Sequence, residues 1–169
     1  MHYLAKVFLV GMPGSGKSTL GREAARLSGM LFFDLDEEIE RSEGRSIKEI
    51  FEQDGEPYFR LLEKDKLEEL TRSNDDFILS TGGGAPCFHN NMDFINRNGR
   101  SIFVNVPLQE LRSRLLQTNL AARPKIGNVK NLGDHLEKTW SERLPIYQMA
   151  HEEVNGVGVG AADLLRLLR

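Results

Sequence analysis

Nine residues near the N-terminus constrain this chain more than any other segment. Residues 11–19 read Gly-Met-Pro-Gly-Ser-Gly-Lys-Ser-Thr and directly follow the apolar run at residues 7–10. The pattern G-x-x-x-x-G-K-[ST] is that of a Walker A loop, in which glycines let backbone N–H groups approach phosphate oxygens. The helix that follows adds its positive N-terminal end to the same anion site. A glycine-rich turn without a ligand is the alternative, but the strand before the loop and the amphipathic helix after it predict a nucleoside triphosphate site.

The residues of this loop have separate predicted roles. We expect Lys17 to reach the terminal phosphates and to act in catalysis, and the Ser18 hydroxyl to ligate Mg²⁺. The nucleotide contacts of the loop are assigned to six residues: Gly14, Ser15, Gly16, Lys17, Ser18 and Thr19.

The composition is that of one globular domain of 169 residues, with 40% hydrophobic and 28% charged residues. No apolar run approaches the roughly 20 residues of a membrane span, and the N-terminus leads straight into the first strand, so we expect no signal peptide. One cysteine, Cys87, excludes an internal disulfide and suits a cytoplasmic location. A net charge of −3 without a polybasic cluster argues against nucleic acid, and four scattered histidines argue against zinc. We expect a monomer without membrane or nucleic-acid partners.

The hydrophobic pattern predicts alternating strands and helices. A strand, a helix and a second buried strand within about thirty residues imply a right-handed βαβ unit and a parallel sheet. The expected fold is therefore α/β, with a five-stranded parallel sheet between two layers of helices. Strands are expected at residues 7–10, 30–33, 77–80, 101–106 and, more weakly, 153–155. Helices are expected at residues 19–28, 36–72 with interruptions at Gly44 and Gly55, 90–96, 107–116, 132–149 with a kink or division at Pro145, and 161–168.

Two segments between the strands are expected to serve function. The helical stretch between the second and third strands, about residues 35–63, is a natural acceptor-binding subdomain. Residues 117–131 are polar and basic and contain Arg123, Lys125 and Lys130. A loop of this length inside a small domain is more often a functional lid than filler. We therefore predict a lid at residues 117–131.

The Walker A loop alone does not distinguish a kinase from a GTPase, a motor ATPase or a nucleotide-dependent switch. The chain has no N-K-x-D sequence for reading guanine and is too short for an oligomeric ATPase module. A single-domain kinase for a small molecule fits best. A regulatory module that binds ATP without catalysis is the alternative from another class, and the presence together of Lys17, Ser18, Asp34 and Arg123 argues against it.

Further motifs make the choice of acceptor specific. In their order along the chain, between Gly11 and Tyr147, they resemble the shikimate kinase family. The motifs are Asp34-Leu35-Asp36, Asp54-Gly55-Glu56 with Phe59-Arg60, Gly82-Gly83-Gly84, Arg123-Pro124, and Arg143 with Pro145 and Tyr147. The resemblance implies a P-loop fold like that of nucleoside monophosphate kinases, with strand order 2-3-1-4-5, and transfer of a phosphoryl group from ATP to the 3-hydroxyl of shikimate in aromatic amino-acid biosynthesis, with Mg²⁺ as cofactor. Kinases of gluconate or of a nucleoside monophosphate are the nearest alternatives.

The resemblance also implies roles for two carboxylates. Asp34 is placed near Mg²⁺, through water, and Asp36 on the hydroxyls of the acceptor, where it orients the attacking hydroxyl and takes its proton. Alternate residues of an extended segment point in opposite directions, which suits two separate tasks. Either carboxylate could instead cap the helix that follows.

The remaining site residues follow from the resemblance and from charge. Shikimate is a carboxylate, so its site should contain arginines that make two-pronged contacts, and Arg60 and Arg143 match. The backbone of Gly82, Gly83 and Gly84 would complete the acceptor site. Arg60 could also be an ion-pair partner of Glu63, one helical turn away, and that contact could orient it.

Two further arginines are assigned to the nucleotide. Arg123 in the lid would stabilise charge on the transferred group and act in catalysis, and Arg114 would stack on adenine. A solvated loop charge is the alternative reading of Arg123. Phe51 and Phe59 could form a wall of the acceptor pocket or belong to the core.

Overall fold

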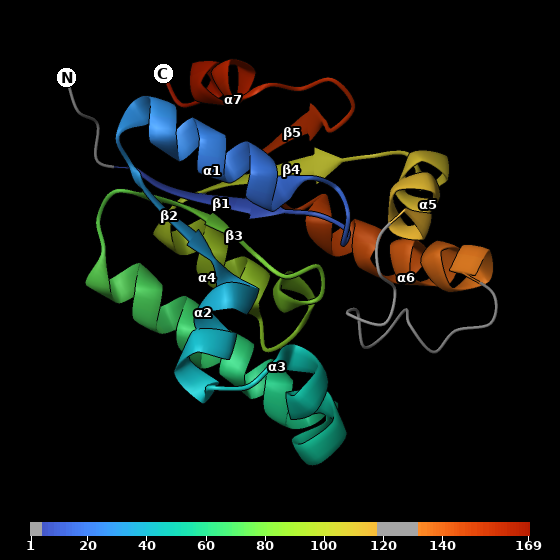
Figure 1. The fold of residues 1–169 in the computed structure, drawn as a ribbon. Helices are drawn as coiled ribbons and strands as arrows, with labels where there is room; N and C mark the ends of the chain where they lie inside the picture. Colours follow the sequence, from blue (N-terminus) through green and yellow to red (C-terminus); the bar gives the residue numbers. More distant parts are fainter. Residues whose placement is uncertain (1–4, 118–131) are drawn as a thin grey trace.

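A computed structural model gives the fold and describes residues 5–117 and 132–169. In these ranges a five-stranded parallel sheet has the order β2-β3-β1-β4-β5 (Figure 1), which confirms the predicted sheet and strand order. The predicted weak fifth strand is present. The strands are β1 (Lys6–Val10), β2 (Leu31–Asp34), β3 (Phe77–Ser80), β4 (Arg100–Asn105) and β5 (Glu152–Asn155).

Helices lie on both faces of this sheet and close to the predicted positions. Helix α3 leaves helical geometry at Gly55 (φ 81°, ψ 173°), so the predicted interruption is present as a kink. The prediction for Pro145 was a kink or a division of the helix; α6 continues through Pro145 as one element, which excludes the division and leaves the kink a prediction. The helices are α1 (Lys17–Ser28), α2 (Leu35–Glu43), α3 (Ile47–Ser73), the short 3₁₀ helix η1 (Ala85–Cys87), α4 (Asn91–Asn98), α5 (Leu108–Leu116), α6 (Leu132–Tyr147) and α7 (Ala161–Leu167).

The core has two halves, one on each face of the sheet. Because successive side chains of a strand point to opposite faces, β1 contributes to both halves. Val7 and Leu9 pack with α1 and α7, whereas Phe8 and Val10 pack with α3, α4, α5 and α6. In Figure 1, α1 and α7 lie on the opposite side of the sheet from α4 and α6. All four of these β1 side chains are fully buried, as predicted for a central strand.

The second strand differs from the prediction. The apolar run at residues 30–33 was expected to be buried, but β2 lies at the edge of the sheet and Leu31 is 54% exposed. A short apolar run indicates a strand without indicating its position in the sheet. Among the described strands β2 pairs only with β3, so its outer side has no neighbouring strand to cover it.

The topology brings three functional segments to one edge of the sheet. In a parallel sheet the carboxyl ends of the strands lie together, and ligands bind outside them. The Walker A loop follows β1, Asp34 ends β2, and the triple glycine at residues 82–84 comes just after β3. Within the described ranges, none of the helices combines the length and apolarity that crossing a bilayer requires.

Candidate active site

The Walker A loop forms the floor of a cavity of about 490 Å³. Gly16, the N-cap of α1, has a left-handed backbone (φ 89°) that glycine adopts without strain. Lys17 is buried, and its Nζ atom donates hydrogen bonds to the carbonyls of Gly11 and Met12, both at 2.9 Å. The predicted nucleotide residues lining the cavity are Gly14, Gly16, Lys17, Ser18, Thr19 and Arg114.

Two of these predicted residues have different surroundings from those expected. Ser15 does not line this cavity. It is buried, and its hydroxyl oxygen lies 3.3 Å from Lys17 Nζ. Arg114 pairs with Glu110 at 2.8 Å and donates weakly to the carbonyls of Gly14 and Gly156, at 3.4 and 3.5 Å. Arg114 therefore connects the phosphate loop to the segment after β5, and its predicted stacking on adenine stays a prediction.

Asp34 joins the phosphate loop to the start of α2. One carboxylate oxygen, Oδ2, accepts a hydrogen bond from the Ser18 hydroxyl, whose oxygen also lies 3.0 Å from the hydroxyl of Ser80. The other oxygen, Oδ1, accepts the backbone N–H groups of Asp36 and Glu37 at 3.1 and 3.2 Å, so Asp34 is the N-cap of α2. The capping alternative therefore holds, and the predicted place of Asp34 near Mg²⁺ stays a prediction. Hard oxygen donors of this kind suit Mg²⁺, and no group of three or more histidine, cysteine or acidic side chains in the described residues forms another metal site.

A second cavity, of about 340 Å³, lies between α2, α3, α6 and the triple glycine. Arg60 and Arg143 both line it, and the phenylalanine rings of residues 51 and 59 contact each other at a centroid distance of 4.8 Å in its wall. All the predicted acceptor residues meet here: Asp36, Arg60, Gly82, Gly83, Gly84 and Arg143.

Arg60 is the most enclosed cation of this cavity. It is 4% exposed, and its Nη1 atom donates to Glu63 at 2.7 Å. Its Nε and Nη2 atoms donate to one oxygen of Glu56, at 3.2 and 3.0 Å. Among the described residues, these contacts use three of the five N–H groups of the Arg60 guanidinium and leave two for a ligand. The predicted pair with Glu63 is present and can orient Arg60 without exhausting its donors.

A Cβ atom at each of the glycines 82–84 would meet a different neighbour. A Cβ atom on the first would lie 2.9 Å from Oδ1 of Asp36. On the second it would lie 2.4 Å from the ring of Pro13, in the phosphate loop, and on the third 2.5 Å from Nη1 of Arg60. The triple glycine therefore lets the phosphate loop and the acceptor residues approach the same backbone.

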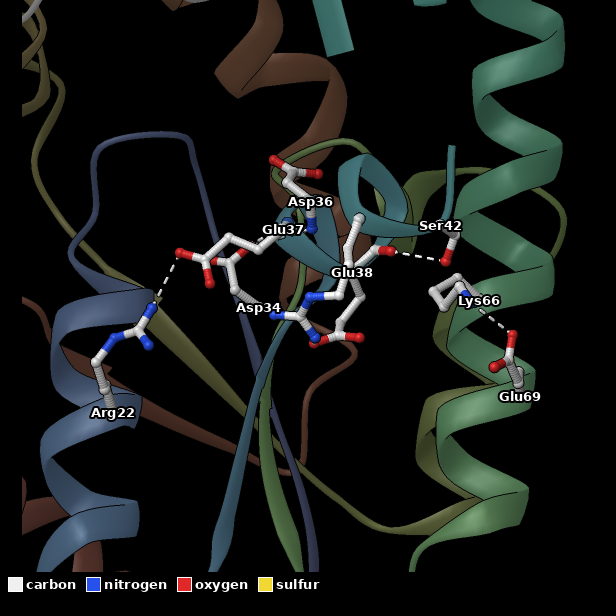
Figure 2. Close-up of polar contacts among 9 residues, drawn as sticks. Arg22, Asp34, Asp36, Glu37, Glu38, Ser42, Lys66 and Glu69 are labelled. Atoms are coloured by element: carbon white, nitrogen blue, oxygen red, sulfur yellow. Dashed lines mark hydrogen bonds and ion pairs between the residues drawn. The ribbon is translucent and has the colours of Figure 1, made fainter. Parts of the chain in front are cut away.

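Asp36 lies in the first turn of α2, so the argument from alternation in an extended segment was wrong: the cap at Asp34 starts the helix two residues earlier. The two carboxylates still have separate surroundings. Figure 2 shows the Asp36 carboxylate above the turn, away from the Glu37–Arg22 ion pair. Its Oδ1 atom is buried without a hydrogen-bond partner in the described residues.

The pKa of Asp36 is raised from 3.8 to about 7, mainly by burial. The negative charges of Glu63 and Asp34 contribute to this rise, and the positive charge of Lys17 opposes it. Burial also raises the pKa of Glu63, against the lowering effect of Arg60 and Arg143. A carboxyl group with a pKa near neutrality and a free buried oxygen can accept a proton from a hydroxyl group.

The two cavities meet at Asp36. Both are lined by the same five residues: Pro13, Asp36, Glu40, Gly82 and Gly83. A small molecule in the second cavity would therefore reach the edge of the cavity over the Walker A loop. Direct transfer of a chemical group between two bound molecules needs this arrangement.

Some parts of the expected site fall elsewhere. Arg123 and nearly all of the predicted lid lie outside the described residues, so both stay predictions. Sequence reasoning missed several residues that line the site from other elements, and no local motif marks them. These are Ser80, His135, Leu136 and Thr139.

Comparison with known proteins gives a consistent result. The sequence model of shikimate kinases matches residues 13–158. A shikimate kinase of Parabacteroides distasonis is 44% identical over 112 residues, which are 66% of this chain and 64% of that protein. One of Clostridium botulinum is 38% identical over 148 residues, 88% of this chain and 85% of that protein. Among solved structures, a shikimate kinase from Acinetobacter baumannii in complex with shikimate has a TM-score of 0.87 and 36% identity, covering 98% of this chain and 91% of that one.

Proposed function

The chain belongs to the shikimate kinase family, and we propose that it transfers the γ-phosphoryl group of ATP to the 3-hydroxyl of shikimate. One observation about this chain's own residues supports the proposal beyond family membership. The cavity with two arginines (the acceptor cavity) and the cavity over the Walker A loop (the phosphate cavity) share a wall at Asp36. An acceptor held by its carboxylate at one end can therefore present a hydroxyl to the phosphate site at the other.

The carboxylate of shikimate binds Arg60 and Arg143, with the backbone at residues 82–84 beside it. The two unused N–H groups of Arg60 match the two oxygens of a carboxylate. The low exposure of Arg60 strengthens this charge pairing because little water competes for it. These acceptor contacts make the helical segment at about residues 35–63 the substrate-binding subdomain.

Asp36 orients the attacking hydroxyl and takes its proton. As the hydroxyl oxygen bonds to the γ-phosphorus, the bond from that phosphorus to the bridging oxygen breaks and ADP leaves. Phosphoryl transfer depends mainly on positioning and on stabilising negative charge. The buried, unpartnered Oδ1 of Asp36 supports this role, because a bound hydroxyl would supply the missing hydrogen-bond donor.

The phosphates of ATP bind the backbone of the Walker A loop and Lys17, whose ammonium now contacts loop carbonyls that lie beside the phosphate cavity. Ser18 and Asp34 would hold Mg²⁺, Asp34 through water, and the bound ion would neutralise charge on the phosphate oxygens. Ser15, Gly16 and Thr19 shape the same loop.

Arg123 and the lid at residues 117–131 complete the site. A cation supplied by a closing loop stabilises the transferred group and helps to exclude water. Removing Arg123 should lower the rate on the order of 10³-fold. Arg114 is assigned to the adenine side of the nucleotide.

We assign the protein to the cytoplasm and expect it to act as a monomer. Size-exclusion chromatography with light scattering tests the monomer: a mass of 19.1 kDa is expected, and a stable dimer would contradict it.

A coupled assay of ADP release with MgATP tests the reaction. Shikimate should give strong turnover, whereas gluconate, AMP and buffer alone should give little. Equal ADP release with and without shikimate would contradict the assignment and indicate a general ATPase.

A further inference from the structure

Arg60 has an aromatic neighbour that the proposed reaction does not use. The Cζ atom of its guanidinium lies over the ring of Phe88, 4.2 Å from the ring centroid. The ring of Phe59 is farther, at 5.3 Å. Both distances fall within the roughly 6 Å of a cation–π contact, and the attraction grows where water is excluded. Phe88 is therefore the closer of the two aromatic contacts of a buried cation.

Core packing does not account for the position of Phe88. Its neighbour Cys87 packs against the larger hydrophobic cluster, and burial raises the pKa of that thiol. Phe88 is half-buried and belongs to neither hydrophobic cluster of the described residues. The contact of its ring with Arg60 is thus not a by-product of filling the core.

The backbone after Phe88 holds the ring in place. His89 and Asn90 both have left-handed backbones, with φ of 52° and 55°, which non-glycine residues rarely adopt. Asn91 stabilises this turn: it is buried, its side chain donates to the carbonyl of Ala85 at 2.8 Å, and its N–H donates to the carbonyl of Phe88 at 2.9 Å.

The two carboxylates hold the guanidinium of Arg60 through two oxygen atoms. Both hydrogen bonds to Glu56 end on a single oxygen, and the bond to Glu63 ends on another. Two anchoring oxygens define an axis about which the guanidinium plane can rock. A ring over the face of the guanidinium resists that rotation.

We infer that Phe88 is a positioning residue for acceptor binding, which holds the guanidinium plane of Arg60 so that its two unused N–H groups face the acceptor cavity. This inference rests on the proposed binding of the acceptor carboxylate by Arg60. Phe88 acts through Arg60 and does not take part in the chemistry.

Steady-state kinetics of three variants test the inference. Phe88→Leu removes the ring and keeps an apolar side chain, and Phe88→Tyr keeps the ring. Phe94→Leu is the matched control, because Phe94 is a half-buried phenylalanine that packs on the core and lies on α4. Phe88→Leu should raise the KM for shikimate about fivefold, within the range of a cation–π contact, with kcat and the KM for ATP within about twofold. Phe88→Tyr and Phe94→Leu should keep the wild-type KM for shikimate.

The methyl ester of shikimate separates this inference from the proposed function. The wild type should have a higher KM for the ester than for shikimate. In Phe88→Leu the ratio of these two KM values should be smaller. Equal use of both by the wild type would show that no cation binds the carboxylate, which overturns the proposed role of Arg60. The wild type could prefer shikimate to the ester while Phe88→Leu keeps both the wild-type KM for shikimate and the wild-type ratio of the two KM values. That result would overturn the role of Phe88. A parallel loss of kcat, ATP affinity and melting temperature, not rescued by tyrosine, would also overturn it.

Discussion

The two cavities of the site are built in different ways. In the phosphate cavity the Walker A loop and the start of α1 offer backbone groups, one lysine and one hydroxyl, and the other lining residues come from the end of β2, from α2, from the segment at the end of β3 and from Arg114. The acceptor cavity draws side chains from α2, α3 and α6 and sets buried charges against one another, with Arg60 between two glutamates.

This difference predicts different responses to substitution. A loop of backbone ligands tolerates side-chain changes that leave its turns intact. A cluster of buried charges does not, because removing one partner leaves the other charge buried and unpaired. Substitutions in the acceptor cavity should therefore alter acceptor binding, catalysis and stability together, in ways that reveal which charge is unpaired.

The largest effect is expected at Asp36, where the cavities meet. Asp36→Asn should lower kcat about 10²- to 10⁴-fold, the usual contribution of a positioned base, while raising the melting temperature, because an uncharged amide replaces a carboxylate that burial disfavours. Coupled ADP release and thermal unfolding measure the two effects. A drop in both activity and stability would mean that Asp36 is structural.

The contrast between the cavities also explains what the sequence could predict. The phosphate site lies within nine consecutive residues after a buried strand, so its geometry is local and its motif is specific. The acceptor residues were identified by resemblance to a family, but their physical roles depend on distant contacts. The burial of Asp36, the neighbour that a Cβ atom on each glycine would meet, and the ring over Arg60 come from segments that only the fold brings together.

The same reasoning explains the errors. The apolar run of β2 predicted a strand correctly and its burial wrongly, because strand order is a property of the whole sheet. The spacing of Asp34 and Asp36 was read as extended chain, although the Asp34 cap starts a helix at once. Local sequence patterns predict helices and strands well, but they predict poorly which other segments those helices and strands contact.

Substitutions of the adjacent glycines Gly83 and Gly84 test whether the two cavities can be altered separately. In Gly84→Ala the new methyl group meets the guanidinium of Arg60, and in Gly83→Ala it meets the ring of Pro13. Overpacking of this kind costs about 1–3 kcal/mol, equivalent to roughly a 5- to 150-fold change in binding. Gly84→Ala should raise the KM for shikimate, because Gly84 lines the acceptor cavity and not the phosphate cavity, whereas Gly83→Ala should raise the KM for ATP as well, because Gly83 lines both. The same change in both constants for both variants would mean that the cavities are not separable at these positions.

The pH dependence of activity tests the electrostatics of Asp36. Only the ionised carboxylate accepts the hydroxyl proton, so kcat/KM should fall about tenfold per pH unit below about pH 7. The groups that set this pKa are Glu63, Asp34, Glu40 and Lys17. A profile that stays flat down to pH 5 would exclude Asp36 as the base.

Stability should follow the opposite course. Because the fold raises the pKa of Asp36 above 3.8, the native state binds its proton more tightly than the unfolded chain does, and the stability from this group is lost as pH rises from about 4 to about 7. The stability advantage of Asp36→Asn over the wild type should therefore grow across that range. Chemical denaturation of the two proteins at pH 4.5, 6 and 7.5 measures the difference, and a constant difference would show that Asp36 keeps an ordinary pKa.

The smallest effect is expected at the metal end of the phosphate cavity. Ser80→Ala removes the hydroxyl 3.0 Å from that of Ser18, leaving Ser18 to be oriented by Asp34 alone. A single hydrogen bond contributes about 0.5–1.5 kcal/mol, so the Mg²⁺ concentration for half-maximal rate should rise roughly two- to tenfold with the KM for shikimate unchanged. Ser101→Ala is the control, because Ser101 is a buried serine of β4 whose hydroxyl bonds to Asn96 and His151, away from Ser18. If only Ser80→Ala changes the Mg²⁺ requirement, β3 contributes to metal binding through its last residue, and the phosphate cavity also depends on a contact that its loop motif does not contain. If both serines behave alike, the loop and Asp34 suffice.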